Sequence, residues 1–433
     1  MRRLALSLSL LLMTALGVPA VASAATAAPT APATAAAVAP AGTIEAMSCL
    51  GAKSCIGVGD YASPVKGASA FLRTWNGASW GPLYGAVPAS AGDYLSSISC
   101  TSAKFCVAVG GRSVANTETG ETDTSPVVAM WNGSAWTKTV PPAPATSIKD
   151  TDLSSVSCAN ARSCVAVGEY YARAHGNVAG GEPSEGFIDR WTGTKWTASY
   201  KTTTGGKGIQ SSQLLGVSCR SATNCVVVGS TFQPIYTFNG PADETYHPVA
   251  LTWNGSRWAA STVPIPSHGH GALEGVSCWS VSRCVAVGNY YANQPVTDPA
   301  PPKSTLIAAR WNGATWSVAK LPSSGSGPQL VGVSCVSAVS CLAVGATNAI
   351  GTDVDRSLAD GWNGKTWRSV AVATPKGGAG KTGPYPNSFE LYDLTCATAK
   401  DCVAFGWAGS LTLGQTPFAE LYAGSRLSNI ADS

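Results

Sequence analysis

Fourteen cysteines are the residues of this sequence whose spacing could most directly carry chemistry. Five residues separate the two members of every pair, and no cysteine is left over: Cys49 and Cys55, Cys100 and Cys106, Cys158 and Cys164, Cys219 and Cys225, Cys278 and Cys284, Cys335 and Cys341, and Cys396 and Cys402. Zinc-binding thiolates usually have about two to four residues between them and need two pairs that converge. The spacing therefore predicts seven disulfides, each closed within its own pair, in an oxidising compartment.

Polar and aromatic residues follow a glycine that stands four positions after every second cysteine. Sugar rings stack on aromatic faces, while carboxylate and amide groups hydrogen-bond to sugar hydroxyls, so these residues are candidates for carbohydrate binding. The alternative is that the rings pack over neighbouring strands, because an aromatic side chain has a large apolar area to bury. Both interpretations stay open for Asp60, Tyr61, Glu169, Tyr170, Tyr171, Asn289, Tyr290, Tyr291 and Trp407.

Acid–base catalysis by paired carboxylates is the main catalytic possibility. Its candidates are Asp60, Glu169, Asp353 and Asp355, and three or more of them around one pocket would favour an enzyme. No carboxylate recurs with the cysteine pairs, and no nucleophile elbow or phosphate-binding loop is present. The four histidines, His175, His247, His268 and His270, all fall in predicted loops, and His268 with His270 makes a two-ligand fragment at best. We therefore predict no metal and no cofactor.

The cysteine pairs belong to a longer repeat that must position these candidates. Successive first cysteines are 51, 58, 61, 59, 57 and 61 residues apart, a period typical of propeller blades. Six repeats also carry a Trp-x-Gly-x-x-Trp block, such as Trp253 to Trp258, and the seventh degenerates to Tyr422 with Leu427 in the second Trp position.

Each repeat predicts four short β-strands. The first ends near the first cysteine (Leu153 to Cys158), and the second begins at the second cysteine (Cys164 to Val167). The third leads into the first Trp (Val249 to Trp253), and the fourth starts at the second Trp (Trp258 to Val263). Asn-Gly dipeptides between the third and fourth strands supply the positive φ angles of tight hairpins. The paired tryptophans have a fixed place on these strands, which favours packing over ligand binding.

The order of a strand ending in glycine (Val165 to Gly168), a variable loop and an aromatic hairpin (Trp191 to Trp196) resembles kelch-type, galactose-oxidase-like propeller repeats. The Ser-Cys-Val-Ala-Val-Gly and Trp-Asn-Gly-x-x-Trp motifs are more closely similar to those of exported actinobacterial repeat proteins. The resemblance covers Ile44 to Leu427 and implies an all-β, seven-bladed β-propeller of four-stranded blades. Kelch repeats usually have two consecutive glycines after the second strand and lack the cysteine pair. Here only Gly110 and Gly111 are consecutive there, so the resemblance implies the fold and no activity.

The N-terminal residues of the sequence predict export. Residues 1–24 fit a signal peptide, with Arg2 and Arg3, an apolar run and the small residues Ala22 to Ala24. The run is shorter than the roughly 20 residues of a membrane span, so we expect no transmembrane span in the mature chain. Residues 25–43 are an Ala/Pro/Thr-rich linker, and residues 44–433 form the repeat domain.

Charge and composition narrow the function classes. The net charge is only +4 and no basic cluster is present, so a nucleic-acid partner is not expected. We expect a secreted or cell-wall-associated monomer that acts as a non-catalytic binding or scaffold protein. Its partner would be an extracellular glycan or another protein, held on the face with the long loops. The alternative is a polysaccharide hydrolase or lyase on the same fold.

Overall fold

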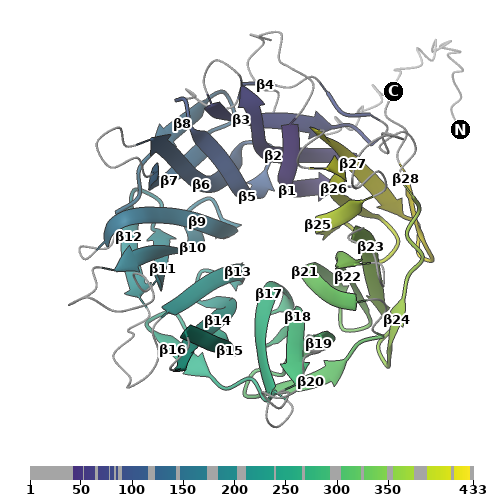
Figure 1. Cartoon of the computed structure of the whole chain (residues 1–433). Coiled ribbons are helices and arrows are strands. Elements are labelled where there is room, and N and C mark those ends of the chain that lie inside the picture. Colours follow the sequence, from purple (N-terminus) through teal and green to yellow (C-terminus); the bar gives the residue numbers. More distant parts are fainter. Residues whose placement is uncertain are drawn as a thin grey trace, which may run out of the picture.

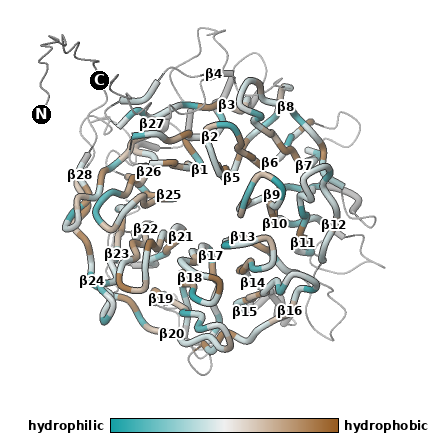
Figure 2. Tube along the Cα trace, turned by 180° about the vertical axis from the view of Figure 1, so that it is seen from behind, coloured by the Kyte–Doolittle hydropathy of each residue, from teal (hydrophilic) through white to brown (hydrophobic). Residues whose placement is uncertain are grey.

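The computed structural model is a ring of seven four-stranded antiparallel sheets around a central axis (Figure 1). Every sheet consists of four consecutive strands in chain order, so each repeat forms one blade. Figure 2 shows the ring from behind, with hydrophobic residues recurring in every blade. The predicted seven-bladed β-propeller is confirmed. Among the described residues there is no helix, and hence none that could cross a membrane.

The structure describes residues 42–429 except 52, 64–66, 78, 82–83, 86–89, 116–121, 143–146, 173–183, 202–210, 238–239, 266–268, 293–303, 323–325, 349–354, 375–387 and 411–413. The predicted signal peptide and nearly all of the linker lie outside these residues. The strands are β1 (Gly42–Gly51), β2 (Ser54–Ser63), β3 (Gly67–Trp75), β4 (Tyr84–Gly85), β5 (Asp93–Ser102), β6 (Phe105–Ala115), β7 (Thr122–Trp131), β8 (Trp136–Thr139), β9 (Ser147–Asn160), β10 (Ser163–Ala172), β11 (Ser184–Trp191), β12 (Trp196–Lys201), β13 (Ser211–Ser221), β14 (Asn224–Thr237), β15 (Gly240–Trp253), β16 (Trp258–Ser261), β17 (Gly269–Ser280), β18 (Arg283–Ala292), β19 (Ser304–Trp311), β20 (Trp316–Lys320), β21 (Ser326–Ser337), β22 (Ser340–Asn348), β23 (Asp355–Trp362), β24 (Trp367–Ser369), β25 (Phe389–Cys396), β26 (Cys402–Ser410), β27 (Gly414–Tyr422) and β28 (Leu427–Asn429).

The disulfides join the first two strands of every blade, as the spacing predicts. The two cysteines of each pair are directly opposed in the strand register, and their Cα atoms lie 3.9–4.1 Å apart. No free cysteine remains. The hairpins between the third and fourth strands also form as predicted, with a glycine at φ between 91° and 99° in all seven, from Gly77 to Gly424. Seven intrachain disulfides indicate an oxidising environment.

A β-bulge interrupts the pairing of the first two strands in every blade, at the residue four positions before the first cysteine. Just beyond the bulge, the backbone of the first strand lies very close to the glycine that stands four positions after the second cysteine. A Cβ atom on Gly168 would lie 1.9 Å from the Asp152 carbonyl oxygen, and one on Gly229 would lie 1.9 Å from the Gln213 carbonyl oxygen. This close backbone approach explains why glycine occupies that position in every repeat.

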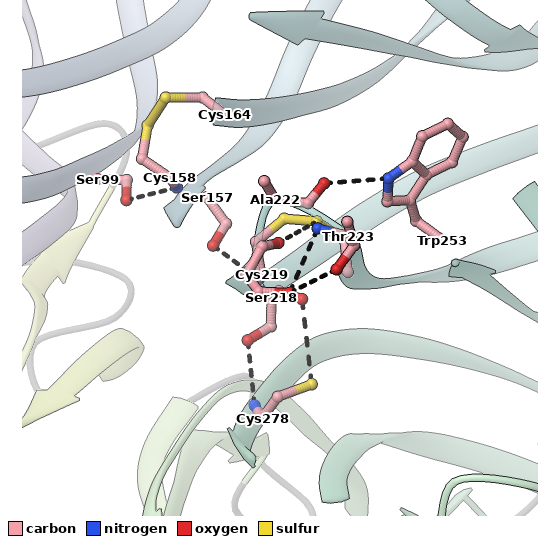
Figure 3. The surroundings of a disulfide bond; sticks show 12 residues. Ser99, Ser157, Cys158, Cys164, Ser218, Cys219, Ala222, Thr223, Trp253 and Cys278 are labelled. Atoms are coloured by element: carbon pink, nitrogen blue, oxygen red, sulfur yellow. Dashed lines mark hydrogen bonds between the residues drawn. A yellow bond between two sulfur atoms is a disulfide. The ribbon is translucent and has the colours of Figure 1, made fainter. Parts of the chain in front are cut away.

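Neighbouring blades are joined by apolar packing and by a repeated hydrogen bond. The residue five positions before the first cysteine is Ile or Leu in every blade, from Ile44 to Leu391, and is at most 2% exposed. The Ser preceding the first cysteine accepts a hydrogen bond from the amide of the next blade's first cysteine (Figure 3). The six bonds, 2.9–3.1 Å long, run from Cys100 to Ser48, Cys158 to Ser99, Cys219 to Ser157, Cys278 to Ser218, Cys335 to Ser277 and Cys396 to Ser334.

The ring closes between the last and first blades without an exchanged strand. Ile44, Met47 and Phe71 of the first blade pack with Val403 and Phe405 of the seventh in one buried cluster. Thr395 and Cys49 occupy the positions of the repeated hydrogen bond. Although the structure describes both residues, no such bond joins them. Closure at this seam rests on side-chain packing.

Candidate functional site

The central channel is the natural place for a site, because side chains of all seven blades meet there. Its lining encloses a cavity of about 250 Å³ at the level of the bulges. One side carries serine hydroxyls, including Ser96 and Ser154, and the other carries apolar residues such as Leu215 and Val331. Three acidic side chains also line the cavity, namely Glu45, Glu274 and Asp393.

The strand ends beyond the bulges form the mouth of the channel. At this level the first strand of each blade contributes the residue six positions before its first cysteine. In six blades these are Tyr94, Asp152, Gln213, Ala272, Gln329 and Glu390. The second strand contributes the paired residue, which is Glu169 opposite Asp152, Asn289 opposite Ala272 and Trp407 opposite Glu390. We call these two sets of residues the channel mouth.

One polar cluster at the mouth spans the first three blades. The Tyr94 hydroxyl donates a hydrogen bond of 3.4 Å to Oδ2 of Asp152. Burial, followed by the carboxylates of Asp152 and Asp60, raises the pKa of Tyr94, so this group remains a protonated donor. Burial raises the pKa of Glu169 to about 7, and the nearby Asp152 carboxylate adds to the rise. Burial also raises the pKa of Asp60.

Asp150 completes this cluster with an unusual backbone. Its φ of 48° is the only positive value at a non-glycine position among the residues that the structure describes. Its Oδ1 accepts a hydrogen bond of 2.9 Å from the amide of Thr124 in the neighbouring blade. Aspartate tolerates this left-handed conformation better than most residues. The bond fixes the carboxylate between the second and third blades.

A second polar cluster lies where the sixth and seventh blades meet. Burial raises the pKa of Glu390 to about 7, and a hydrogen bond with Asp355 and its charge add to the rise. The Trp407 indole donates a hydrogen bond to the Tyr392 hydroxyl. Burial and then the charge of Glu390 raise the pKa of Tyr392. This cluster combines two carboxyls with the buried Trp407 and the half-buried Tyr392.

Aromatic rings gather on the same face between the fourth and fifth blades. His270 lies between Tyr246 and Tyr291, with ring centroids 6.4 and 5.3 Å away. The Asn289 amide donates a hydrogen bond of 3.1 Å to the Tyr291 hydroxyl. The prediction that His270 lies in a loop is wrong, because it is a buried residue of β17. His247 also lies in a strand, β15, whereas His175 and His268 fall outside the described residues.

The aromatic candidates divide into buried and accessible rings. Tyr170 is fully buried and packs against Phe187, and its hydroxyl donates a hydrogen bond to Glu185. Tyr290 and Trp407 are each 7% exposed, and Asn289 is equally buried. Tyr171 is 38% exposed and Tyr291 is half-buried. Packing thus accounts for the position of Tyr170, Tyr290 and Trp407, whereas Tyr171 and Tyr291 can reach a ligand.

The sequence predicts that a variable loop begins after this glycine, and for these candidates that prediction is wrong, because they lie on strands. Asp60 and Tyr61 belong to β2, Glu169 to Tyr171 to β10, Asn289 to Tyr291 to β18, and Trp407 to β26. The middle strands stay paired well past the glycine, which sequence patterning did not indicate. The Tyr61 side chain lies outside the described part of the chain.

The four catalytic candidates do not come together. Asp60 and Glu169 belong to the first cluster and Asp355 to the second, while Asp353 lies outside the described residues. Sequence reasoning missed Tyr94, Asp150, Asp152 and Glu390. An alignment of the seven repeats on their first cysteines could have found the mouth positions, because polar residues flank the Ile or Leu that recurs five positions earlier. No group of three or more potential metal ligands occurs among the described residues.

Comparison with known proteins supports the fold. No protein-family model matches the sequence, and no curated protein matches it. Among solved structures, two of a polysaccharide lyase of family PL25, ulvan lyase, superpose with TM-scores of 0.54 and 0.53 at 10% identity. Each match covers 90% of this chain and 93% of the other. A GH74 xyloglucanase from Xanthomonas campestris gives a TM-score of 0.43 at 10% identity, over 89% of this chain and 58% of that one.

Proposed function

We propose that this protein is an extracellular binding protein that holds a glycan at the channel mouth. The observation that carries the proposal is the ring of hydrogen-bonding side chains at one structural position, with Tyr94, Asp152, Gln213, Gln329 and Glu390 on different blades. Rigid strands hold these groups, which favours recognition because little conformational entropy is lost on binding. The accessible rings of Tyr171 and Tyr291 supply stacking surfaces beside them.

A glycan array and a pull-down with purified cell-wall polysaccharides test this function. The variants Asp152→Asn and Tyr171→Ala should each weaken binding at least tenfold without lowering the melting temperature by more than a few degrees. Val339→Ala, at an exposed turn on the opposite face, is the matched control and should bind as the unmodified protein does. Absence of any glycan ligand, or binding that survives both mouth variants, would refute the proposal and favour a protein partner.

A polysaccharide lyase or hydrolase is the second candidate. It is favoured by Glu169, whose pKa near 7 suits proton transfer at neutral pH, beside Asp152 and the Tyr94 hydroxyl. Solved propellers of similar architecture include the ulvan lyase named above. Incubation with polysaccharides, followed by assays for new reducing ends and for unsaturated products, tests it. Activity abolished by both Glu169→Gln and Tyr94→Phe would replace the binding function with catalysis.

A further inference from the structure

The channel and its mouth are acidic, although the chain as a whole carries a net positive charge of +4. Asp152 and Glu390 stand at the mouth on the first strands, and Asp60 and Glu169 stand beside them on the second strands. Glu45 and Glu274 line the cavity below. No Lys or Arg occupies the positions six or four residues before the first cysteine, or five after the second, in any of the seven repeats.

Three basic side chains on the strands of these blades have partners of their own. Nζ of Lys138 lies 2.7 Å from Oδ2 of the buried Asp93, and Nε of Arg112 lies 4.0 Å from Oδ1 of the same carboxylate. Arg356 lies over the ring of Phe389, 5.3 Å from its centroid. No described Lys or Arg contributes to the pKa shifts of Asp152, Glu169 and Glu390 at the channel mouth.

We infer that the channel mouth selects against polyanionic polysaccharides, so that the glycan of the proposed function is uncharged. The inference rests on that proposed function. An incoming carboxylate or sulfate would meet like charges from two sides in a partly water-excluded site, where charges are screened less than in bulk solvent. A neutral glycan can donate its hydroxyls to the same carboxylate oxygens without this repulsion.

Selectivity should grow as the pH rises. The groups that face Glu169 are Asp152 on β9, Ser184 on β11, Gln213 on β13 and Tyr171 on its own strand, and none of them is cationic. Glu390 faces Asp355 on β23 and Tyr392 on its own strand. Both carboxyls lose their protons between about pH 6 and pH 8, since burial raises each pKa to about 7 and the carboxylates of Asp152 and Asp355 add to the rise. The negative charge at the mouth is therefore larger at pH 8 than at pH 5.

Two forms of one glycan, with free and with methyl-esterified carboxylates, provide the binding test. Oligogalacturonide and its fully methyl-esterified form would be compared by calorimetry with the whole protein at pH 5 and pH 8. We expect the ester to bind at least tenfold more tightly at pH 8, with a smaller difference at pH 5. The double variant Asp152→Asn/Glu169→Gln should reduce the preference. Equal binding, or tighter binding of the acid, would overturn the inference.

A second measurement tests the charge of the mouth independently of glycan binding. If neither glycan binds, that result contradicts the proposed function but not the inferred charge of the mouth. Gln329→Cys places a thiol on the exposed mouth position of the sixth blade. Mass spectrometry first shows that the variant has one free thiol. The rates at which this thiol reacts with two methanethiosulfonates are then compared, one carrying a cationic trimethylammonium group and the other an anionic sulfonate group. We expect the ratio of the cationic to the anionic reaction rate to be at least tenfold higher for Gln329→Cys than for Val339→Cys on the opposite face. Glu390→Gln with Asp355→Asn should remove most of that excess. Equal ratios at the two positions would refute the inference.

Discussion

Single glycines set the inner geometry of each blade. Gly229→Ala should lower the free energy of unfolding by about 1–3 kcal/mol, because the new methyl group would overlap the Gln213 carbonyl oxygen, and backbone on two paired strands must then move. Gly51→Ala is the matched control, since nothing lies within 4 Å of a Cβ atom there and its φ is not positive. Urea denaturation of both variants measures the difference. Equal stabilities would show that the bulge accommodates a side chain.

Buried carboxyls predict the response of stability to pH. Asp189 and Glu420 stand two residues before the aromatic residue that ends the third strand in their blades, and both are fully buried. No hydrogen-bond partner for either occurs among the described residues. Burial raises the pKa of Asp189 to about 7 and that of Glu420 to about 8, against about 4 in an unfolded chain. The folded state therefore holds protons that the unfolded state releases above about pH 4.

The stability contributed by these protonated carboxyls is fully present below about pH 4 and is lost as the pH rises through 7 to 8. Melting temperatures should accordingly fall between pH 5 and pH 8.5. The double variant Asp189→Asn/Glu420→Gln keeps the shape of both side chains without their charge, so its melting temperature should depend less on pH and exceed that of the unmodified protein at pH 8.5. An unchanged pH dependence would contradict the assignment.

At the scale of the strand, the hydroxyl before each first cysteine connects one blade to the next. Ser218→Ala should cost about 1–3 kcal/mol, because the amide of Cys278 loses its acceptor at a half-buried position. Thr395→Val removes the corresponding hydroxyl at the seam, where no equivalent bond forms, and should cost less. Chemical denaturation of the two variants checks this. A larger loss for Thr395→Val would show that the seam hydroxyl has an unrecognised partner.

The sequence contained enough information to predict the strands and their pairing, but not the site. Alternating cysteine pairs, tryptophans and Asn-Gly dipeptides act within one repeat, so the hairpins from Cys158 to Cys164 and from Trp253 to Trp258 could be predicted from local chemistry. The channel mouth depends on the bulges, which bring Tyr94 of one blade against Asp152 of the next. Contacts of that kind join repeats 58 residues apart, and no local pattern predicts their geometry.

At the scale of the whole ring, the seam between the seventh and first blades should be the least stable interface. Elsewhere, each pair of neighbouring blades shares an apolar cluster, a chain connection and a serine hydrogen bond. At the seam the cluster of Ile44, Met47 and Phe405 remains, without a chain connection or a serine hydrogen bond among the described residues.

Native-state hydrogen exchange should therefore show opening of the seam before the ring unfolds globally. We expect the amides of β1 and β25 that exchange by local opening to be less protected than the corresponding amides of β13 and β17. A disulfide engineered across the seam should remove this difference by holding the two blades together, whereas the same cross-link between the fourth and fifth blades should leave it unchanged. Equal protection of all seven innermost strands would show that side-chain packing alone closes the ring as firmly as the connections between the other blades.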